Sequence, residues 1–317
     1  MAPVPPPAPI VEVTADAPPP RPTLRERLFR PRLLIAAALL AMIPVLGPWV
    51  RRQIPDLTQR PEYRMRFQDV LLIPPATDPL PVDFIEQVRR RADLPSELPL
   101  LDPDLPLKVA TAFAAHPWVE RVDQVSNQAP ALVTVKLQYR RVVALVEVPD
   151  GLYPIDPQGI LLPPQDFTPD DARDYLVVRG ITSIPFGAAG KPWGDPAVAA
   201  AAALADFIGP RWKELQLTAI VAPRITSAST QPDDVLLELE STGGSRIQWG
   251  RKPGSTYPGE LEAGQKVGRL DKYLREFGSY HQPQGPYAID IRHWHEITRK
   301  PLVDPRFTAT RKSPNRR

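Results

Sequence analysis

A stretch of uncharged, apolar residues near the N-terminus places the strongest constraint on what this chain can fold into. Residues 33–50 read LLIAAALLAMIPVLGPWV. A helix of that length rises about 27 Å, at about 1.5 Å per residue, and the hydrocarbon layer of a bilayer is about 30 Å thick. The sequence therefore predicts a single transmembrane helix at 33–50, in direct contact with the lipid bilayer.

The basic residues around this stretch predict its orientation. Arg51 and Arg52 follow it, whereas five arginines precede it: Arg21, Arg25, Arg27, Arg30 and Arg32. Because basic flanks are retained on the cytoplasmic side, we expect a cytoplasmic N-terminus and an exported remainder. The predicted location is the inner membrane of a bacterium, with the bulk of the chain in the periplasm.

A cleaved signal peptide and a buried core helix are the two alternatives to a permanent anchor. A signal peptide has a small-residue cleavage site close behind its apolar core, whereas Pro48, Trp49 and Arg51 follow here. A core helix would show polar positions at helical spacing, and this stretch has none. Pro44 fits the anchor, because membrane helices tolerate proline.

Composition excludes some classes of function and shapes the rest of the chain. The chain has no cysteine, which excludes disulfides, thiolate metal sites and cysteine nucleophiles. The net charge is +3, but the basic residues are scattered rather than interleaved with aromatic residues, so nucleic acid is not an expected partner. The 43 prolines, well above the background of about 5%, predict short elements.

The first half of the exported region predicts a small α+β domain. A strand-like end at 63–73 is followed by apolar residues at helical spacing over 82–92. A second helix is predicted after Asp104, as its N-cap, and it stops before Pro117. Strands at 119–125 and 131–139 complete a βααββ order, with a turn at 127–130 and the helices on one face of the sheet.

The second half predicts a mostly antiparallel β domain with two helices. Asp195 and Pro196 mark the start of the first helix, which ends before Gly209, and residues 267–277 mark the second. A hairpin turn is predicted at 242–244. The predicted strands are 142–148, 152–155, 160–162, 215–221, 235–240, 245–250 and 287–294.

These patterns divide the chain into six predicted segments. They are a disordered Pro- and Arg-rich cytoplasmic tail (1–32), the transmembrane helix (33–50), a linker (51–62), the small α+β domain (63–139), the β domain (140–300) and a basic disordered tail (301–317).

Several short motifs, in this order, resemble the FtsQ/DivIB family of bacterial cell-division proteins. Pro117, Trp118 and Val119 are similar to the Pro-Trp-Val signature of that family's POTRA domain. Further likenesses are YPIDPQGI (153–160), VLLELESTGGSRIQWG (235–250), KVGRLDKYLREF (266–277) and YAIDIRHW (287–294). The resemblance implies a POTRA-like domain, then a β domain ending in an exposed strand, with no catalysis and no cofactor.

The last predicted strand is the candidate site for binding a partner. We expect alternate side chains of 287–294 to face the core, which leaves Asp290, Arg292 and Trp294 on the other face. An exposed edge strand offers unpaired backbone groups to an added strand. The candidate partner-binding residues are Tyr287, Ile289, Asp290, Ile291, Arg292, His293, Trp294 and Trp249. The resemblance implies FtsB/FtsL-like coiled-coil proteins as partners here, and upstream division proteins at the POTRA domain.

The sequence predicts no catalytic, cofactor or metal site, and no small-molecule substrate. His293 and His295 would share a face of the last strand, but no third ligand is apparent. The acidic pairs at 170–171 and 233–234 fit a helix start and a turn. No nucleophile motif or phosphate-binding loop is present.

The resemblance to the FtsQ/DivIB family implies a non-enzymatic scaffold of the division septum that binds other membrane proteins and helps to control septal peptidoglycan synthesis. The alternative is a POTRA-containing chaperone of outer-membrane or secretion assembly. Such proteins usually continue into a transmembrane barrel of long alternating strands, and no such strands are evident. An envelope enzyme would need a cluster of acids or a nucleophile, and the sequence offers neither.

Overall fold

The computed structural model describes residues 60–77, 80–128, 132–168, 170–227 and 229–302, with the isolated positions Ile35, Leu40 and Met42. Apart from those three positions, the predicted transmembrane helix lies outside the described residues, as do the N-terminal tail and residues 303–317. Within the described residues, no helix has the length and apolar character needed to cross a membrane. The chain divides into two units, Met1–Leu57 and Thr58–Arg317, and every element below belongs to the second.

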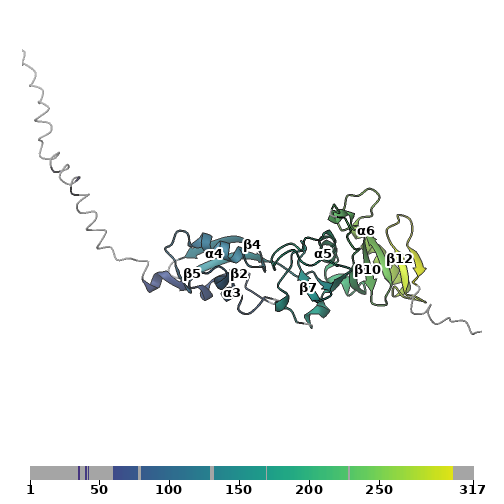
Figure 1. The fold of residues 1–317 in the computed structure, drawn as a ribbon, viewed down its shortest axis with the longest axis horizontal. Coiled ribbons are helices and arrows are strands. Elements are labelled where there is room, and N and C mark those ends of the chain that lie inside the picture. Colours follow the sequence, from purple (N-terminus) through teal and green to yellow (C-terminus); the bar gives the residue numbers. More distant parts are fainter. Residues whose placement is uncertain are drawn as a thin grey trace, which may run out of the picture. The chain divides into compact units, whose positions relative to one another are not determined.

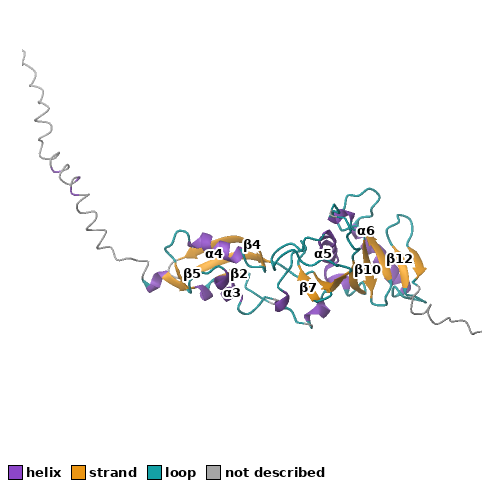
Figure 2. Ribbon diagram, in the orientation of Figure 1, coloured by secondary structure: helices purple, strands orange, loops and turns teal. Residues whose placement is uncertain are grey.

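The fold is α+β, and Figures 1 and 2 show two successive modules of helices and strands. In the first module, two helices cover one face of a three-stranded sheet with the order β2-β5-β4. The elements are β2 (Leu71–Ile73), α3 (Phe84–Arg91), α4 (Leu105–Ala114), β4 (Val119–Gln128) and β5 (Leu132–Tyr139). β2 runs parallel to β5, and β4 runs antiparallel to it.

Residue spacing explains why these segments close a core. Phe84 and Val88 lie one turn apart on α3 and are both buried, and the Phe84 ring lies 6.1 Å from that of Phe113 on α4. Val133 and Val135 alternate with more exposed neighbours along β5. The predicted helices and the period-two strand are therefore confirmed. The predicted turn at 127–130 begins too early, because β4 continues to Gln128.

The strand-like end predicted for 63–73 is observed as β2. The residues before it form a further short strand, β1 (Arg64–Arg66), and a 3₁₀ turn (Phe67–Asp69). The turn buries both Phe67 and Val70, which lie three residues apart and would face opposite sides of a straight strand. β1 pairs instead with β3 (Glu97–Pro99), an antiparallel strand that the Pro-rich sequence conceals.

The second helix follows Asp104 as predicted, because α4 begins at Leu105 and Asp104 occupies its N-cap position. However, Asp104 has helical backbone angles and its side chain makes no capping hydrogen bond. The carboxylate of Asp102 lies just before the helix. It accepts from the Asp104 backbone N–H at 2.9 Å and from Lys108 Nζ at 2.6 Å.

The second module contains a sheet of eight described strands in the order β13-β12-β11-β10-β9-β8-β6-β7. The strands are β6 (Ala144–Val148), β7 (Gly151–Ile155), β8 (Leu176–Arg179), β9 (Leu217–Val221), β10 (Leu237–Ser241), β11 (Arg246–Gly250), β12 (Tyr287–Asp290) and β13 (Thr298–Pro301). Helices α5 (Pro196–Ile208) and α6 (Ala263–Phe277) pack on the sheet over a shared apolar core. Short 3₁₀ helices lie at Pro61–Tyr63, Phe67–Asp69, Pro164–Asp166, Asp171–Asp174, Gly209–Trp212 and Pro232–Asp234.

This sheet is mixed rather than mostly antiparallel as predicted. β8 is parallel to both β6 and β9, and β11 is parallel to β12. Parallel neighbours need a crossover connection, and α5 joins β8 to β9 while α6 joins β11 to β12. β8 was not predicted from the sequence, so the first of these crossovers was not evident.

The start of α5 follows the predicted pattern. Asp195 is extended and its carboxylate accepts from the Ala197 backbone N–H at 2.8 Å, with Pro196 in the first turn. Gly209 ends the helix with a φ of +53°, which favours glycine. The hairpin turn at 242–244 between β10 and β11 is likewise confirmed.

Candidate functional site

The predicted recognition strand differs from the observed one. β12 ends at Asp290, and residues 291–297 leave the sheet before the chain returns as β13. β12 lies between β11, to which it is parallel, and β13, to which it is antiparallel. The prediction that 287–294 forms the last, open strand is therefore wrong. The sequence Thr298–Pro301 was missed because it is short and mostly polar.

β13 forms one end of the described sheet, and its backbone alternates between the sheet and the outside. The Leu302 N–H donates to the Pro286 carbonyl at 2.8 Å, and Lys300 and Thr298 pair with Ala288 and Asp290. The backbone groups of the intervening residues, Ile297, Arg299 and Pro301, therefore point away from the sheet. Pro301 has no N–H to donate at such a position, so it costs the sheet no hydrogen bond.

The opposite end of the sheet is partly covered. There β7 is the last named strand, and its Ile155 forms an antiparallel bridge with Leu161. The Leu162 N–H also donates to the Pro154 carbonyl at 2.9 Å. Of the two ends of this sheet in the described part of the chain, the β13 end is the more open to an added strand.

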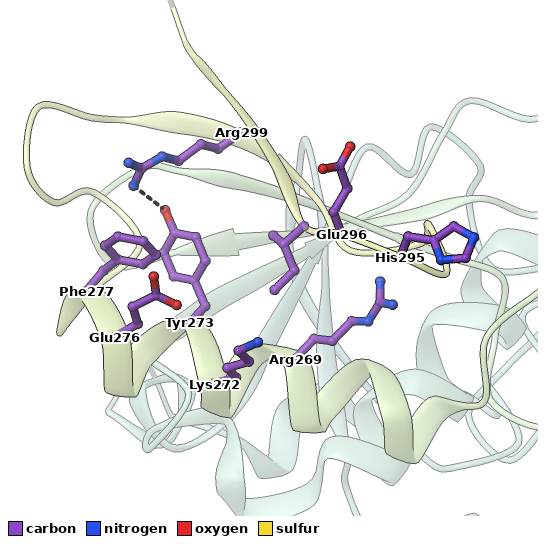
Figure 3. Close-up of a pocket in the computed structure, with 9 residues that line it drawn as sticks. Arg269, Lys272, Tyr273, Glu276, Phe277, His295, Glu296 and Arg299 are labelled. Carbon is purple, nitrogen blue, oxygen red and sulfur yellow. Dashed lines mark hydrogen bonds between the residues drawn. The ribbon is translucent and has the colours of Figure 1, made fainter.

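A groove of about 410 Å³ runs between α6 and the segment that leads into β13. Figure 3 shows the side chains of Arg269 and Lys272 extending from the helix toward the segment that carries His295 and Glu296. The lining residues are Arg269, Lys272, Tyr273, Glu276, Phe277, His295, Glu296, Ile297 and Arg299. The groove is thus aromatic at one end and charged along its length.

Arg299 joins β13 to the aromatic end of this groove. Its guanidinium lies 4.5 Å from the centre of the Phe277 ring and 5.3 Å from that of Tyr287. It also donates to the Tyr273 hydroxyl at 3.5 Å (Figure 3). Cation–π contacts of this kind hold the guanidinium against α6. The Arg299 side chain therefore lies over the helix while its backbone faces outward.

Arg269 fixes the loop between β12 and β13. Its guanidinium donates to the backbone carbonyls of Ile291 and Trp294, each at 2.8 Å, and to that of His293. Three carbonyls held by one side chain define the path of the loop. Arg269 therefore holds the loop between β12 and β13 in place. By contrast, the groove residues Lys272, Glu276 and Glu296 form no ion pair with any described residue.

Asp290 and Arg292 form a local ion pair beside this loop. Arg292 donates to both carboxylate oxygens of Asp290, at 3.0 Å from Nε and 2.7 Å from Nη2. Burial pushes the pKa of Asp290 upward, but the side-chain and backbone hydrogen bonds from Arg292 outweigh it, so the pKa is lowered. His293 Nε2 lies 3.5 Å from the same carboxylate. The pair keeps Asp290 ionised.

The two candidate tryptophans differ in exposure. Trp294 is 58% exposed, and its indole N–H donates to the Gly259 carbonyl at 3.2 Å. Trp249 is fully buried, and its indole N–H donates to the Arg251 carbonyl at 3.0 Å. Lys266 lies over the Trp249 ring at 5.0 Å and pairs with Glu260. Trp294 is available to a partner on this surface, whereas Trp249 belongs to the core.

The other predicted candidates are divided between core and surface. Tyr287, Ile289 and Ile291 are buried, as the alternating pattern predicts. His293 and His295 lie after the end of β12, so they do not share the strand face predicted for them. No group of three or more His, Asp or Glu side chains in the described ranges is arranged to hold a metal ion.

The predicted Pro-Trp-Val signature lies elsewhere. Pro117, Trp118 and Val119 are all buried where the first module meets the second. The groove residues Arg269, Lys272 and Arg299 were not predicted as candidates. Arg269 and Lys272 are three residues apart on α6, a spacing that places them on neighbouring turns, and both lie within the 266–277 motif; these were the signals for them in the sequence.

Together, the open backbone of β13 and the groove beside it can bind an extended peptide whose flanking segment occupies the groove. The exposed Trp294 lies on the loop that bounds the same region. Comparison with known proteins adds no assignment: no protein-family model matches the sequence, and no curated protein matches it significantly.

Proposed function

We propose that this protein is a non-enzymatic scaffold of FtsQ/DivIB type, anchored in the bacterial inner membrane with its two modules in the periplasm. It binds other cell-division membrane proteins, of the FtsB/FtsL-like coiled-coil kind, and thereby helps to control septal peptidoglycan synthesis. The order of the motifs supports the proposal. So does the βααββ order of the first module, with its sheet order β2-β5-β4, which fits a POTRA-like domain.

The observation that carries the proposal is the open backbone of β13. The outward N–H and C=O groups of Ile297 and Arg299, and the carbonyl of Pro301, can pair with a strand from a partner. A partner strand would find few backbone groups on β13 for hydrogen bonding, because Pro301 has no N–H to donate. The partner segment is therefore short and centred opposite Arg299.

The groove supplies side-chain selectivity to the same site. Lys272 carries a charge without an ion-pair partner among the described residues, and it extends toward the β13 side of the groove (Figure 3). An acidic side chain on the flanking segment of the partner can approach Lys272 without displacing an internal ion pair. The exposed Trp294 provides an aromatic anchor at the rim.

Affinity capture with the full chain in detergent, using short coiled-coil inner-membrane proteins as candidates, tests this site. Arg299→Pro removes the backbone N–H at the centre of the open edge. Lys272→Glu reverses the charge of that side chain in the groove. Both variants are expected to weaken capture by about tenfold or more. Trp294→Ala is expected to weaken it as well.

The matched control is Arg224→Glu, a charge reversal at an exposed position outside the groove. It is expected to leave capture unchanged. Equal capture by the wild type and by all three site variants would place the interface elsewhere.

A fluorescent fusion tests the cellular role. The proposal expects the fusion to concentrate at the septum of dividing cells. An even distribution around the envelope, together with capture of unfolded outer-membrane β-barrel precursors, would favour a chaperone of outer-membrane assembly and would contradict the scaffold.

A further inference from the structure

The two modules are held together by non-covalent contacts as well as by the polypeptide chain. Trp118, between α4 and β4, is fully buried, and its indole N–H donates to the Asp166 carboxylate at 2.7 Å. Its ring also lies 5.8 Å from that of Phe167. Asp166 and Phe167 follow β7 of the second module. A side chain of the first module is therefore held by residues from the second.

Leu162 takes part in the same junction. It is fully buried and packs into the apolar core of the first module, although it lies beyond β6 and β7 in the sequence. Its backbone N–H donates to the Pro154 carbonyl at 2.9 Å, which anchors it to the second module. Leu162 thus belongs by its backbone to one module and by its side chain to the other.

Gly190 shows how closely the second module approaches the signature residues. A Cβ atom at Gly190 would lie 3.2 Å from Pro117 Cα, and its φ of +93° disfavours any other residue. The Gly190 N–H donates to the Leu161 carbonyl at 2.7 Å, so this loop also supports the segment that carries Leu162.

An ion pair forms a second link at the start of the same segment. Arg140 Nη1 lies 2.6 Å from Asp156 Oδ2, and the Asp156 side chain is fully buried. The other oxygen of Asp156 accepts from the backbone N–H groups of Gln158 and Ile160, each at 2.9 Å. Arg140 also donates its backbone N–H to the Trp118 carbonyl at 2.8 Å. This backbone hydrogen bond therefore joins Trp118 of the first link to Arg140 of the second.

We propose that residues 156–167, here named the strap, are an interdomain lock that holds the two modules in one relative orientation. The covalent connection at 140–143 would by itself allow a hinge. The strap closes that hinge at two separate points, Trp118 with Asp166 and Arg140 with Asp156. The buried Pro-Trp-Val sequence serves this lock, and the inference does not depend on the identity of any partner.

Hydrogen–deuterium exchange on the full chain in detergent tests the lock. Asp166→Ala and Trp118→Phe each remove one partner of the indole–carboxylate bond. Each is expected to speed exchange of amides in 117–119 and 160–167 by about tenfold or more. The double variant is expected to exchange no faster than the faster single variant, because the two changes break the same bond.

Asp150→Ala is the matched control, since it removes a carboxylate that accepts from an aromatic side chain within the second module, in the 3.0 Å bond from the Tyr153 hydroxyl. It is expected to leave the strap unchanged. Unchanged exchange at 117–119 in Asp166→Ala would overturn the lock. So would equal acceleration in the middle of α4 and β5, which would indicate general loss of core packing.

A distance measurement between the modules tests whether the strap fixes their relative orientation or only makes a local contact. The chain has no cysteine, so spin labels can be placed at Glu120→Cys and Thr226→Cys alone. The distance distribution is expected to be narrow in the otherwise wild-type chain and broader with Asp166→Ala. A distribution that is equally narrow, or equally broad, in both would contradict the proposal.

Discussion

Two buried polar side chains, His116 and Lys266, are expected to affect the stability of the fold. His116 is buried after α4, and its ring packs edge-on against Phe84 at 4.7 Å. Its Nδ1 accepts from the Trp118 backbone N–H at 3.3 Å. Lys266 on α6, with 1% exposure, is buried and forms an ion pair with Glu260. Both residues place an ionisable side chain among apolar residues, so a change in either one is expected to alter the free energy of unfolding.

Stability is expected to fall on acidification because of His116. Burial, with a smaller contribution from Arg91 and an opposing one from Asp83, lowers its pKa from 6.5 to about 4. Between these values the unfolded chain binds the proton and the folded chain does not. The free energy of unfolding therefore falls by about 2–3 kcal/mol as the pH drops from 6.5 to 4.

Urea unfolding at several pH values, with His116→Gln as the comparison, checks this expectation. In the His116→Gln variant, the free energy of unfolding is expected to change much less between pH 6.5 and 4. An identical pH profile for the two proteins would show that another group is responsible.

Removing one partner of the buried Lys266–Glu260 pair is expected to be costly. Lys266→Met leaves the Glu260 carboxylate with its backbone donor from Arg251 at 3.0 Å but without its cation. We expect a loss of about 3–5 kcal/mol of unfolding free energy, measured by urea denaturation. The double variant Lys266→Met with Glu260→Gln is expected to recover part of that loss, and failure to do so would contradict a charge-based explanation.

At the scale of helices and strands, local patterns were informative where an element carries its own signals. Asp195, Pro196 and Gly209 mark α5 in the sequence, and the structure confirms them. β8 and β13 carry no such signals, because each is only four residues long, and β8 pairs with strands far away in the sequence. Without β8 the parallel crossover through α5 was hidden, and without β13 the open edge was assigned to β12.

A close backbone approach at the end of β8 gives a prediction at this scale. A Cβ atom at Gly180 would lie 2.2 Å from the Ala222 carbonyl oxygen, and Gly180 has a φ of +88°. Gly180→Ala is therefore expected to destabilise the fold by about 2–4 kcal/mol, because it strains the backbone and separates β8 from β9.

Gly209→Ala is the matched control. Gly209 also has a positive φ, +53°, but nothing lies within 4 Å of an added Cβ. It is expected to cost about 1 kcal/mol. Thermal unfolding of both variants compares the two costs, and equal losses would show that the contact with Ala222 adds nothing.

At the scale of the whole molecule, composition and pattern predicted the class and the order of modules, but not the site in detail. The α+β class and the core positions Tyr287, Ile289 and Ile291 follow from periodicity. The groove forms because α6 and the segment leading into β13 lie side by side, with Arg269 and Arg299 both in its lining, and no local pattern encodes that arrangement. The same is true of Trp118 and Asp166.

Membrane topology is the prediction that belongs to the entire chain. Alkaline phosphatase fused after residue 317 is expected to be active, and β-galactosidase at the same place inactive, because residues 33–50 are predicted to cross the membrane with the N-terminus inside. The mature protein is expected to remain in the membrane fraction at full length. A cytoplasmic reporter, or a shortened soluble product, would contradict the anchor.

Pro301 has one further consequence, for the behaviour of the protein with copies of itself. An uncovered strand is a template on which identical chains can stack into open-ended assemblies. Here the growing face has a missing donor at Pro301, and Lys300 adds an exposed positive charge next to it. Like charges repel and the hydrogen-bond ladder is interrupted, so self-stacking is disfavoured even where copies of the chain are concentrated.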